Sequence, residues 1–161
     1  MKKPAFVYKI VLFILSVLLS FNLIFAQNNK EQDIRKLIQS REFTFMAEQM
    51  LPTGGIGRNI VTENYDLRLL NDSISVLLPY IGRAFTAAYG SSEGGVRLNT
   101  KNFDYKVKNR KKGGWNITIK PGRSDIREMN LIVSETGFAT LNVISNNRQS
   151  ISYTGRIVPR N

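Results

Sequence analysis

The chain has 161 residues, with 23 Lys and Arg against 12 Asp and Glu, a formal net charge of +11, and neither His nor Cys. The missing residue types exclude Ser-His-Asp and Cys-His nucleophilic centres, and they also exclude the usual zinc and copper sites, which need imidazole or thiolate ligands. Disulfides are excluded as well. Only chemistry based on carboxylates, Lys, Tyr, hydroxyl groups or hard cations is left, so we expect neither a cofactor nor a metal.

The N-terminal segment has the pattern of a secretory signal peptide. Three lysines precede an apolar run within residues 10–25, and Ala26 offers a small residue for cleavage before a polar stretch. We therefore expect residues 1–26 to be a signal peptide and residues 27–161 to form a single β-rich domain, periplasmic or secreted. An uncleaved anchor is the alternative, because the apolar run approaches the length that spans a bilayer. No Cys follows the run, which excludes a lipid-anchored precursor.

The first elements after this segment are a helix and a strand. Residues from about 30 to 40 carry apolar side chains at helical spacing, which predicts a short amphipathic helix packed on a sheet. From Glu42 onward every second residue is apolar, which predicts a strand. The Pro and Gly residues of the stretch 51–57 predict a turn or loop after that strand.

Alternating apolar and polar residues predict strands for the rest of the chain. The segment 65–80 is expected to form a hairpin that turns at Asn71 and Asp72. Further strands are expected at about residues 96–98, 103–107, 115–119, 126–134, 138–144 and 149–158. No second helix is long enough to connect parallel strands. The predicted fold is therefore mainly β, an antiparallel curled sheet or partly closed barrel with meander connections, with the N-terminal helix covering one face or mouth.

Several strings occur together and in a characteristic order: LPTGG at 51–55, LPYIGRA at 78–84, EGGV at 93–96, YKV at 105–107, KKGGW at 111–115 and SNNRQSISYTG at 145–155. They resemble an uncharacterised family of small exported proteins from Gram-negative bacteria, the domain of unknown function numbered forty-two fifty-one (DUF4251). The resemblance covers nearly all of residues 27–161 and implies a secreted or periplasmic β-rich domain. It implies no catalytic residue or ligand, because no activity is assigned to the family. Many relatives are lipoproteins, and this chain departs from them in lacking the lipidation Cys.

The stretch 78–95 is the first candidate site, because a strand end, aromatic residues and glycines lie close together there. The candidate ligand-binding residues in it are Tyr80, Arg83, Phe85, Tyr89 and Glu93. In the functional interpretation, Arg83 pairs with a carboxylate or phosphate while the aromatic rings stack on a sugar or an acyl chain. In the structural interpretation, the rings fill the end of the sheet and Arg83 forms an ion pair with Glu93.

The segment 146–149 is the second candidate, because its amides and the guanidinium of Arg148 suit the hydroxyl groups of a glycan or a peptide backbone. An Asn-Asn pair also favours a tight hairpin turn, which is the structural alternative.

A run of basic residues near a Trp is a candidate anionic-surface site. Its members are Lys106, Lys108, Lys111, Lys112 and Trp115. Lipid head groups or the phosphates of lipopolysaccharide would suit this charge, whereas nucleic acid is not expected for an exported protein. Protection of a sheet edge by lysines explains the run equally well.

The sequence offers two further candidate sites. Ser73 lies in Asp-Ser-Ile on an expected turn, which resembles a short O-glycosylation signal of some Gram-negative anaerobes. A glycan hydrolase would need two facing carboxylates, and the plausible acids are Asp66, Glu93, Asp104 and Glu128. Nothing in their spacing forces two of them together.

The sequence therefore predicts a non-enzymatic binding or structural domain of the bacterial envelope, with an envelope glycan, a lipid head group or a partner protein as its partner. The alternative is a small carrier that holds a lipid or another apolar ligand inside a partly closed barrel. A carboxylate-based glycan hydrolase is the third possibility. No nucleic acid is expected, and no stable membrane anchor if the signal is cleaved.

Overall fold

The computed structural model describes residues 30–83, 85 and 95–160, so the predicted signal peptide lies outside it. A helix occupies residues 30–40, and a single 3-10 turn, η1, occupies Val61–Glu63. The strands are β1 (Glu42–Pro52), β2 (Arg58–Asn59), β3 (Asp66–Leu70), β4 (Ser73–Pro79), β5 (Gly95–Thr100), β6 (Phe103–Asn109), β7 (Trp115–Pro121), β8 (Ile126–Val133), β9 (Phe138–Ser145) and β10 (Ile151–Val158).

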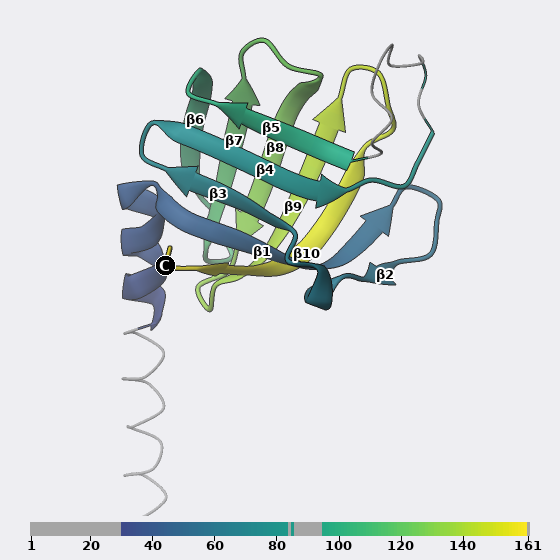
Figure 1. Ribbon diagram of the computed structural model, residues 1–161. Coiled ribbons are helices and arrows are strands. Elements are labelled where there is room, and N and C mark those ends of the chain that lie inside the picture. Colours follow the sequence, from purple (N-terminus) through teal and green to yellow (C-terminus); the bar gives the residue numbers. More distant parts are fainter. Residues whose placement is uncertain (1–29, 84, 86–94, 161) are drawn as a thin grey trace, which may run out of the picture.

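The strands form one antiparallel sheet that curls into a nearly closed barrel (Figure 1). Its order is β5-β4-β3-β1-β10-β9-β8-β7-β6, and β2 pairs with β1 beside this path. Two meanders, β3 to β5 and β6 to β10, are thus joined through the pairing of β1 with β10. The outer strands β5 and β6 are neighbours in the chain but do not pair, so an open seam remains between them. The predicted mainly β architecture is confirmed.

Apolar side chains fill the inside of the curl because each strand directs alternate residues inward. In β1, Phe43 and Phe45 are fully buried, and their partners across β3 and β10 include Leu67, Leu69 and Ile157. Burial of one such side chain contributes about 2–3 kcal/mol before the entropy of ordering is subtracted. The strand alternation therefore supplies the core of the molecule.

The helix covers one end of the barrel (Figure 1). Its apolar residues Ile34 and Ile38 are buried, and the Tyr105 hydroxyl of β6 donates a hydrogen bond of 3.1 Å to the Ile38 carbonyl oxygen. A Cβ at Gly137, in the turn between β8 and β9, would lie 2.8 Å from a methyl group of Ile34, so this helix sits directly on that turn. Within the described residues, every helix falls short of the length and apolar character needed to cross a membrane.

Three features differ from the sequence expectation. Strand β1 continues through Leu51 and Pro52, although Pro was expected to end it earlier. Pro52 is tolerated because it is the last residue of the strand, opposite Ile151 of β10. Strand β10 begins at that Ile151 rather than two residues earlier, and the short elements β2 and η1 were not predicted.

Candidate binding site

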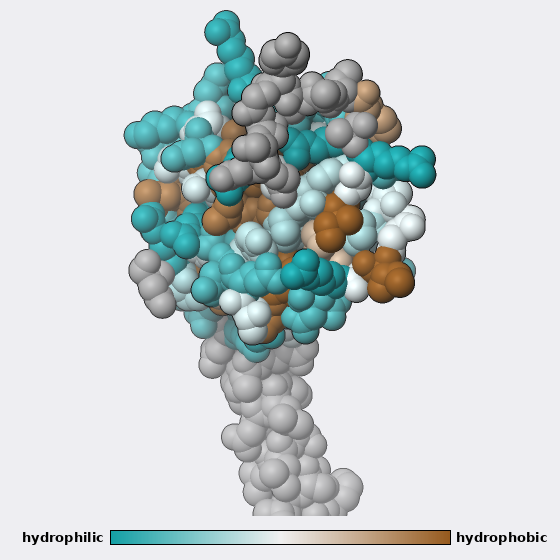
Figure 2. Space-filling view, turned by 45° about the vertical axis from the view of Figure 1, so that its right-hand side comes forward, coloured by the Kyte–Doolittle hydropathy of each residue, from teal (hydrophilic) through white to brown (hydrophobic). Residues whose placement is uncertain are grey.

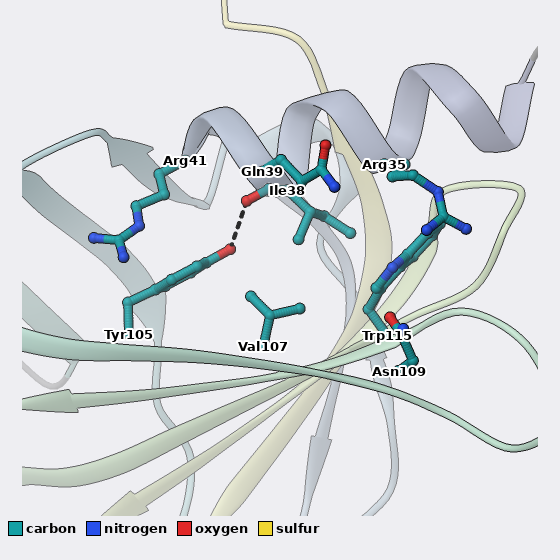
Figure 3. Close-up of a pocket in the computed structure, with 8 residues that line it drawn as sticks. All are labelled: Arg35, Ile38, Gln39, Arg41, Tyr105, Val107, Asn109 and Trp115. Atoms are coloured by element: carbon teal, nitrogen blue, oxygen red, sulfur yellow. Dashed lines mark hydrogen bonds between the residues drawn. The ribbon is translucent and has the colours of Figure 1, made fainter.

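A hollow of about 340 Å³ lies between the helix and the outer strand β6 (Figure 3). We call it the seam hollow, because β6 is one border of the open seam. The residues that line it are Arg35, Ile38, Gln39, Arg41, Tyr105, Val107, Asn109 and Trp115.

Local structure brings these residues together. Positions 35, 38 and 39 lie on one face of the helix because they are three and four residues apart. Tyr105, Val107 and Asn109 alternate along β6 and therefore point to the same side of the sheet. Trp115 begins β7 directly opposite Asn109. The hollow is thus bordered by one helix face above and by one strand face below (Figure 3).

Two guanidinium groups flank the hollow, each over an aromatic ring. The Arg35 guanidinium lies 5.5 Å from the centre of the Trp115 ring, and that of Arg41 lies 4.9 Å from the centre of the Tyr105 ring. Arg35 also pairs with Glu31 at 2.8 Å. In the part of the chain that the structure describes, Arg41 has no carboxylate within ion-pair distance. Its positive charge is therefore available to a ligand.

The backbone of Arg41 adopts a left-handed conformation, with φ of 58°. Gly is the usual residue at such a position just after a helix, because other L-residues are strained there. The carbonyl oxygen of Arg41 accepts a hydrogen bond of 2.8 Å from the N–H of Asn71, which holds the conformation. The fold therefore places a long cationic side chain where glycine would be less strained.

Tyr105 remains neutral beside this charge. Burial raises the pKa of the Tyr105 phenol, and the nearby Arg41 guanidinium opposes the shift only in part. The phenol therefore does not neutralise Arg41, and the seam hollow keeps a net positive character.

A second cluster lies at the end of the barrel away from the helix, and Arg148 is its centre. The Arg148 guanidinium donates hydrogen bonds to Asp125 at 3.1 Å and to the Gly95 carbonyl oxygen at 2.9 Å. It also lies 5.2 Å from the centre of the Tyr80 ring. Arg148 thus ties together the first residue of β5, the segments before β8 and β10, and the segment after β4. Two of the predicted binding residues, Tyr80 and Arg148, are brought into direct contact here.

The segment after β4 is fixed to the segment before β10. The Tyr80 hydroxyl donates to the carbonyl oxygens of Gln149 at 3.1 Å and Arg83 at 3.2 Å. Backbone bonds from Gln149 to Arg83 and from Phe85 to Asn147 continue the pairing. Burial is the main cause that raises the pKa of Tyr80. The functional groups of Tyr80 and Arg148 are therefore largely committed to holding this end of the barrel together.

Other side chains of this end remain exposed. Phe85 is 67% exposed and Ile81 is 52% exposed. The Arg83 guanidinium has no partner within the described ranges. Figure 2 shows hydrophobic side chains standing separately among hydrophilic ones on this side of the molecule. Tyr89 and Glu93 lie outside the described residues, so the expected pair of Arg83 with Glu93 falls outside them too.

The basic run is divided between two faces. Lys106 and Lys108 are exposed on the side of β6 opposite the seam hollow, and Lys111 and Lys112 are exposed at the hairpin tip. Trp115 is only 4% exposed and points toward Arg35 in the hollow. The indole ring therefore does not share a surface with Lys106 and Lys108.

The Ser73 hydroxyl donates to the Leu70 carbonyl oxygen at 3.3 Å and is half-buried at the start of β4.

The acids considered for hydrolysis lie apart on β3, β6 and β8, apart from Glu93, which is outside the described residues. Asp66 pairs with Arg68 at 2.7 Å, and Glu128 pairs with Lys120 at 3.1 Å. Asp104 lies opposite Lys120 on the neighbouring strand, so this lysine separates Asp104 from Glu128. Over the described ranges, no three His, Cys, Asp or Glu side chains are placed to hold a metal ion.

Most residues of the seam hollow were not among the sequence candidates. Arg35 and Gln39 come from the helix, Arg41 follows it and Asn109 ends β6, and each is an ordinary polar residue in its own segment. The polar tip of Tyr105, an inward-facing residue in a strand, is the one signal that could have indicated a partly open interior at this point.

Comparison with known proteins agrees with the architecture. The solved structure of a DUF4251 family protein from Bacteroides eggerthii superposes with a TM-score of 0.61 at 18% identity, covering 81% of this chain and 87% of that one. At this identity the likeness shows the fold alone. No curated protein matches the chain. The family model described as Domain of unknown function (DUF4251) matches residues 26–157, so the chain belongs to the DUF4251 family.

Proposed function

We propose that this chain is an exported, non-enzymatic binding domain, and that the seam hollow receives the anionic group of an envelope ligand. The observation that carries the proposal is the pair of guanidiniums that flank the hollow, with Arg41 free of any carboxylate partner among the described residues. An arginine held over an aromatic ring keeps its planar donors directed outward, and it suits a carboxylate or phosphate better than lysine does.

The rest of the hollow fits an amphipathic anion. Ile38 and Val107 offer apolar surface, while Gln39 and Asn109 offer amide donors and acceptors. The volume of about 340 Å³ lies at the lower end of the range of ligand sites, roughly 300–1,000 Å³. A single head group with a short chain, or one side chain of a larger partner, is the appropriate size.

The seam hollow is favoured over the barrel interior as the ligand site. The inward-facing residues Phe45, Leu67, Ile117, Leu131 and Tyr153 are all fully buried against one another. A lipid carried inside the curl would have to displace these side chains, whereas the seam hollow is open to solvent.

Octyl phosphate and octanoate are suitable probes, titrated into residues 27–161 at low salt and followed by calorimetry and native mass spectrometry. We expect both anions to bind, and Arg41→Gln to weaken binding by about tenfold, which corresponds to one charge-assisted hydrogen bond. Arg58→Gln is the matched control, because Arg58 is exposed and pairs with Glu63 away from the hollow. Equal losses in the two variants would contradict a specific site and would indicate general attraction to a basic protein.

Export is tested with the full chain expressed in a Gram-negative host. We expect the protein in the periplasmic fraction with Gln27 as its first residue. An intact N-terminus in the membrane fraction would instead support the uncleaved anchor.

A further inference from the structure

The outer strand β6 presents a row of backbone groups that the sheet does not use. One backbone hydrogen bond lies just beyond each end of its pairing with β7. The Arg110 N–H donates to the Gly114 carbonyl oxygen, and the Gly122 N–H donates to the Asn102 carbonyl oxygen. In an antiparallel pair, every second residue exchanges both of its backbone bonds with the partner strand. The even-numbered residues of β6 therefore face β7, and the N–H and C=O groups of Phe103, Tyr105, Val107 and Asn109 point away from it, toward the seam.

This edge is open over its second half. Residues 106–109 are all exposed, and β5, the nearest strand in the chain, does not pair with β6. Three of these odd-numbered residues, Tyr105, Val107 and Asn109, also line the seam hollow (Figure 3). A strand added along β6 would thus meet free backbone groups on one side and a cationic hollow for its own side chains.

We propose that β6 binds an extended acidic peptide segment of a partner protein by strand addition. Main-chain bonds to the odd-numbered residues supply the pairing, and alternate side chains select the sequence. Lys106 and Lys108 stand on one face of the edge, and Arg35 and Arg41 stand on the other, so acidic side chains on either face of the peptide meet a cation.

Charge also argues against a second copy of this chain as the occupant. Residues 27–161 keep 20 of the 23 basic residues and all 12 acidic ones, so two copies would bring like charges together along β6, which is how edge lysines oppose self-association. The preference for an acidic peptide rests on the proposed function, because an acidic side chain of the peptide would occupy the hollow. The backbone pairing of the peptide with β6 does not depend on the proposed function.

Amide hydrogen exchange by NMR tests the backbone part in the unaltered protein. The probe is an acetylated and amidated (Glu-Val)4 peptide, with (Lys-Val)4 as its charge-reversed control. In the free protein we expect fast exchange at Tyr105, Val107 and Asn109 and slow exchange at Lys106 and Lys108. Addition of (Glu-Val)4 should slow exchange at the three odd positions by at least about tenfold, whereas (Lys-Val)4 should not. Protection of the odd amides before any peptide is added would overturn the proposal.

A proline variant separates strand addition from binding in the hollow. Val107→Pro removes an outward N–H that the sheet does not use, so the fold should persist, and Val107→Thr keeps the N–H as a control. Both variants alter the Val107 side chain that lines the hollow, so Val107→Thr measures that contribution. We expect Val107→Pro to weaken the (Glu-Val)4 complex at least about fivefold more than Val107→Thr does, because only proline removes the N–H. If Arg41→Gln abolished peptide binding and Val107→Pro left it intact, strand addition would be overturned. The same result would support the seam hollow as the binding site. A Val107→Pro-sensitive dimer in sedimentation would also overturn it, because the occupant would then be a second copy.

Discussion

At the scale of single residues, Arg41 has both an unusual backbone conformation and a proposed role in binding. It follows the helix with a left-handed backbone, and its guanidinium lies over the Tyr105 ring with no carboxylate partner among the described residues. Strained backbone at a position that another residue would fill more easily suggests that the side chain is kept for a purpose. Arg41 is therefore expected to contribute to binding at some cost to stability.

Two substitutions separate these contributions. Arg41→Gly and Arg41→Ala both remove the guanidinium, but only glycine relieves the left-handed strain, so Arg41→Gly should be more stable to urea by about 1 kcal/mol. Both variants should lose octyl phosphate binding to the same extent. Equal stability of the two variants would show that the backbone at this position is not strained in solution.

At the scale of elements, Arg148 is a structural link among four segments of the barrel end. Its ion pair with Asp125 is only partly exposed, with side chains 24% and 34% accessible, and the second Asp125 carboxylate oxygen is buried without a hydrogen-bond partner. Removal of the guanidinium would leave that carboxylate poorly solvated. The structural interpretation therefore accounts for the contacts of Arg148.

Arg148→Gln should lower the free energy of unfolding by about 1–2 kcal/mol, below the value for a fully buried pair because solvent reaches both groups. Asp125→Asn in the same chain should restore part of the loss, since the unpaired carboxylate is then gone. Urea unfolding of the two single variants and the double variant measures the coupling. Strictly additive losses would mean that Arg148 acts through Tyr80 or Gly95 instead.

The elements themselves were largely predictable, and the clusters were not. Alternation located β3, β4 and β7 to β9, because each strand has one buried face. It did not reveal that Tyr80 meets Arg148, or that Arg41 meets Tyr105, because each contact joins segments far apart in the chain through a register that the pattern leaves open. The end of β1 was placed too early because Pro52 is compatible with the last position of a strand.

At the scale of the whole molecule, the sheet has the strand order of a simple meander, except that β1 and β10 lie in the middle of the order and not at its two edges. Suppose that the chain is cut between residues 101 and 102 and that its two ends are joined. The strands then follow one another from β6 to β10 and from β1 to β5, which is their order in the sheet. The ends lie close together, because Lys30 and Pro159 border one hollow. Every strand pair of the barrel would thus be retained.

A circular permutant that begins at Asn102, ends at Lys101, and joins residue 160 to residue 30 through a short Gly-Ser linker should therefore fold. We expect its circular dichroism spectrum to match that of the parent and its unfolding free energy to fall by no more than about 2 kcal/mol, the cost of a new flexible connection. A permutant opened within β8, between Asn130 and Leu131, is the control and should not fold. Failure of both would show that the link across the seam is required.

The pairing of β1 with β10 also determines the order in which the molecule can be completed during synthesis. The first strand to leave the ribosome has one neighbour, β3, that follows soon afterwards, but its other neighbour is the last strand of all. Until residues 151–158 have emerged, the two meanders have no edge in common and the hydrophobic side of β1 lies half uncovered. The chain therefore falls short of its final compact state until residues 151–158 are available to pair with β1.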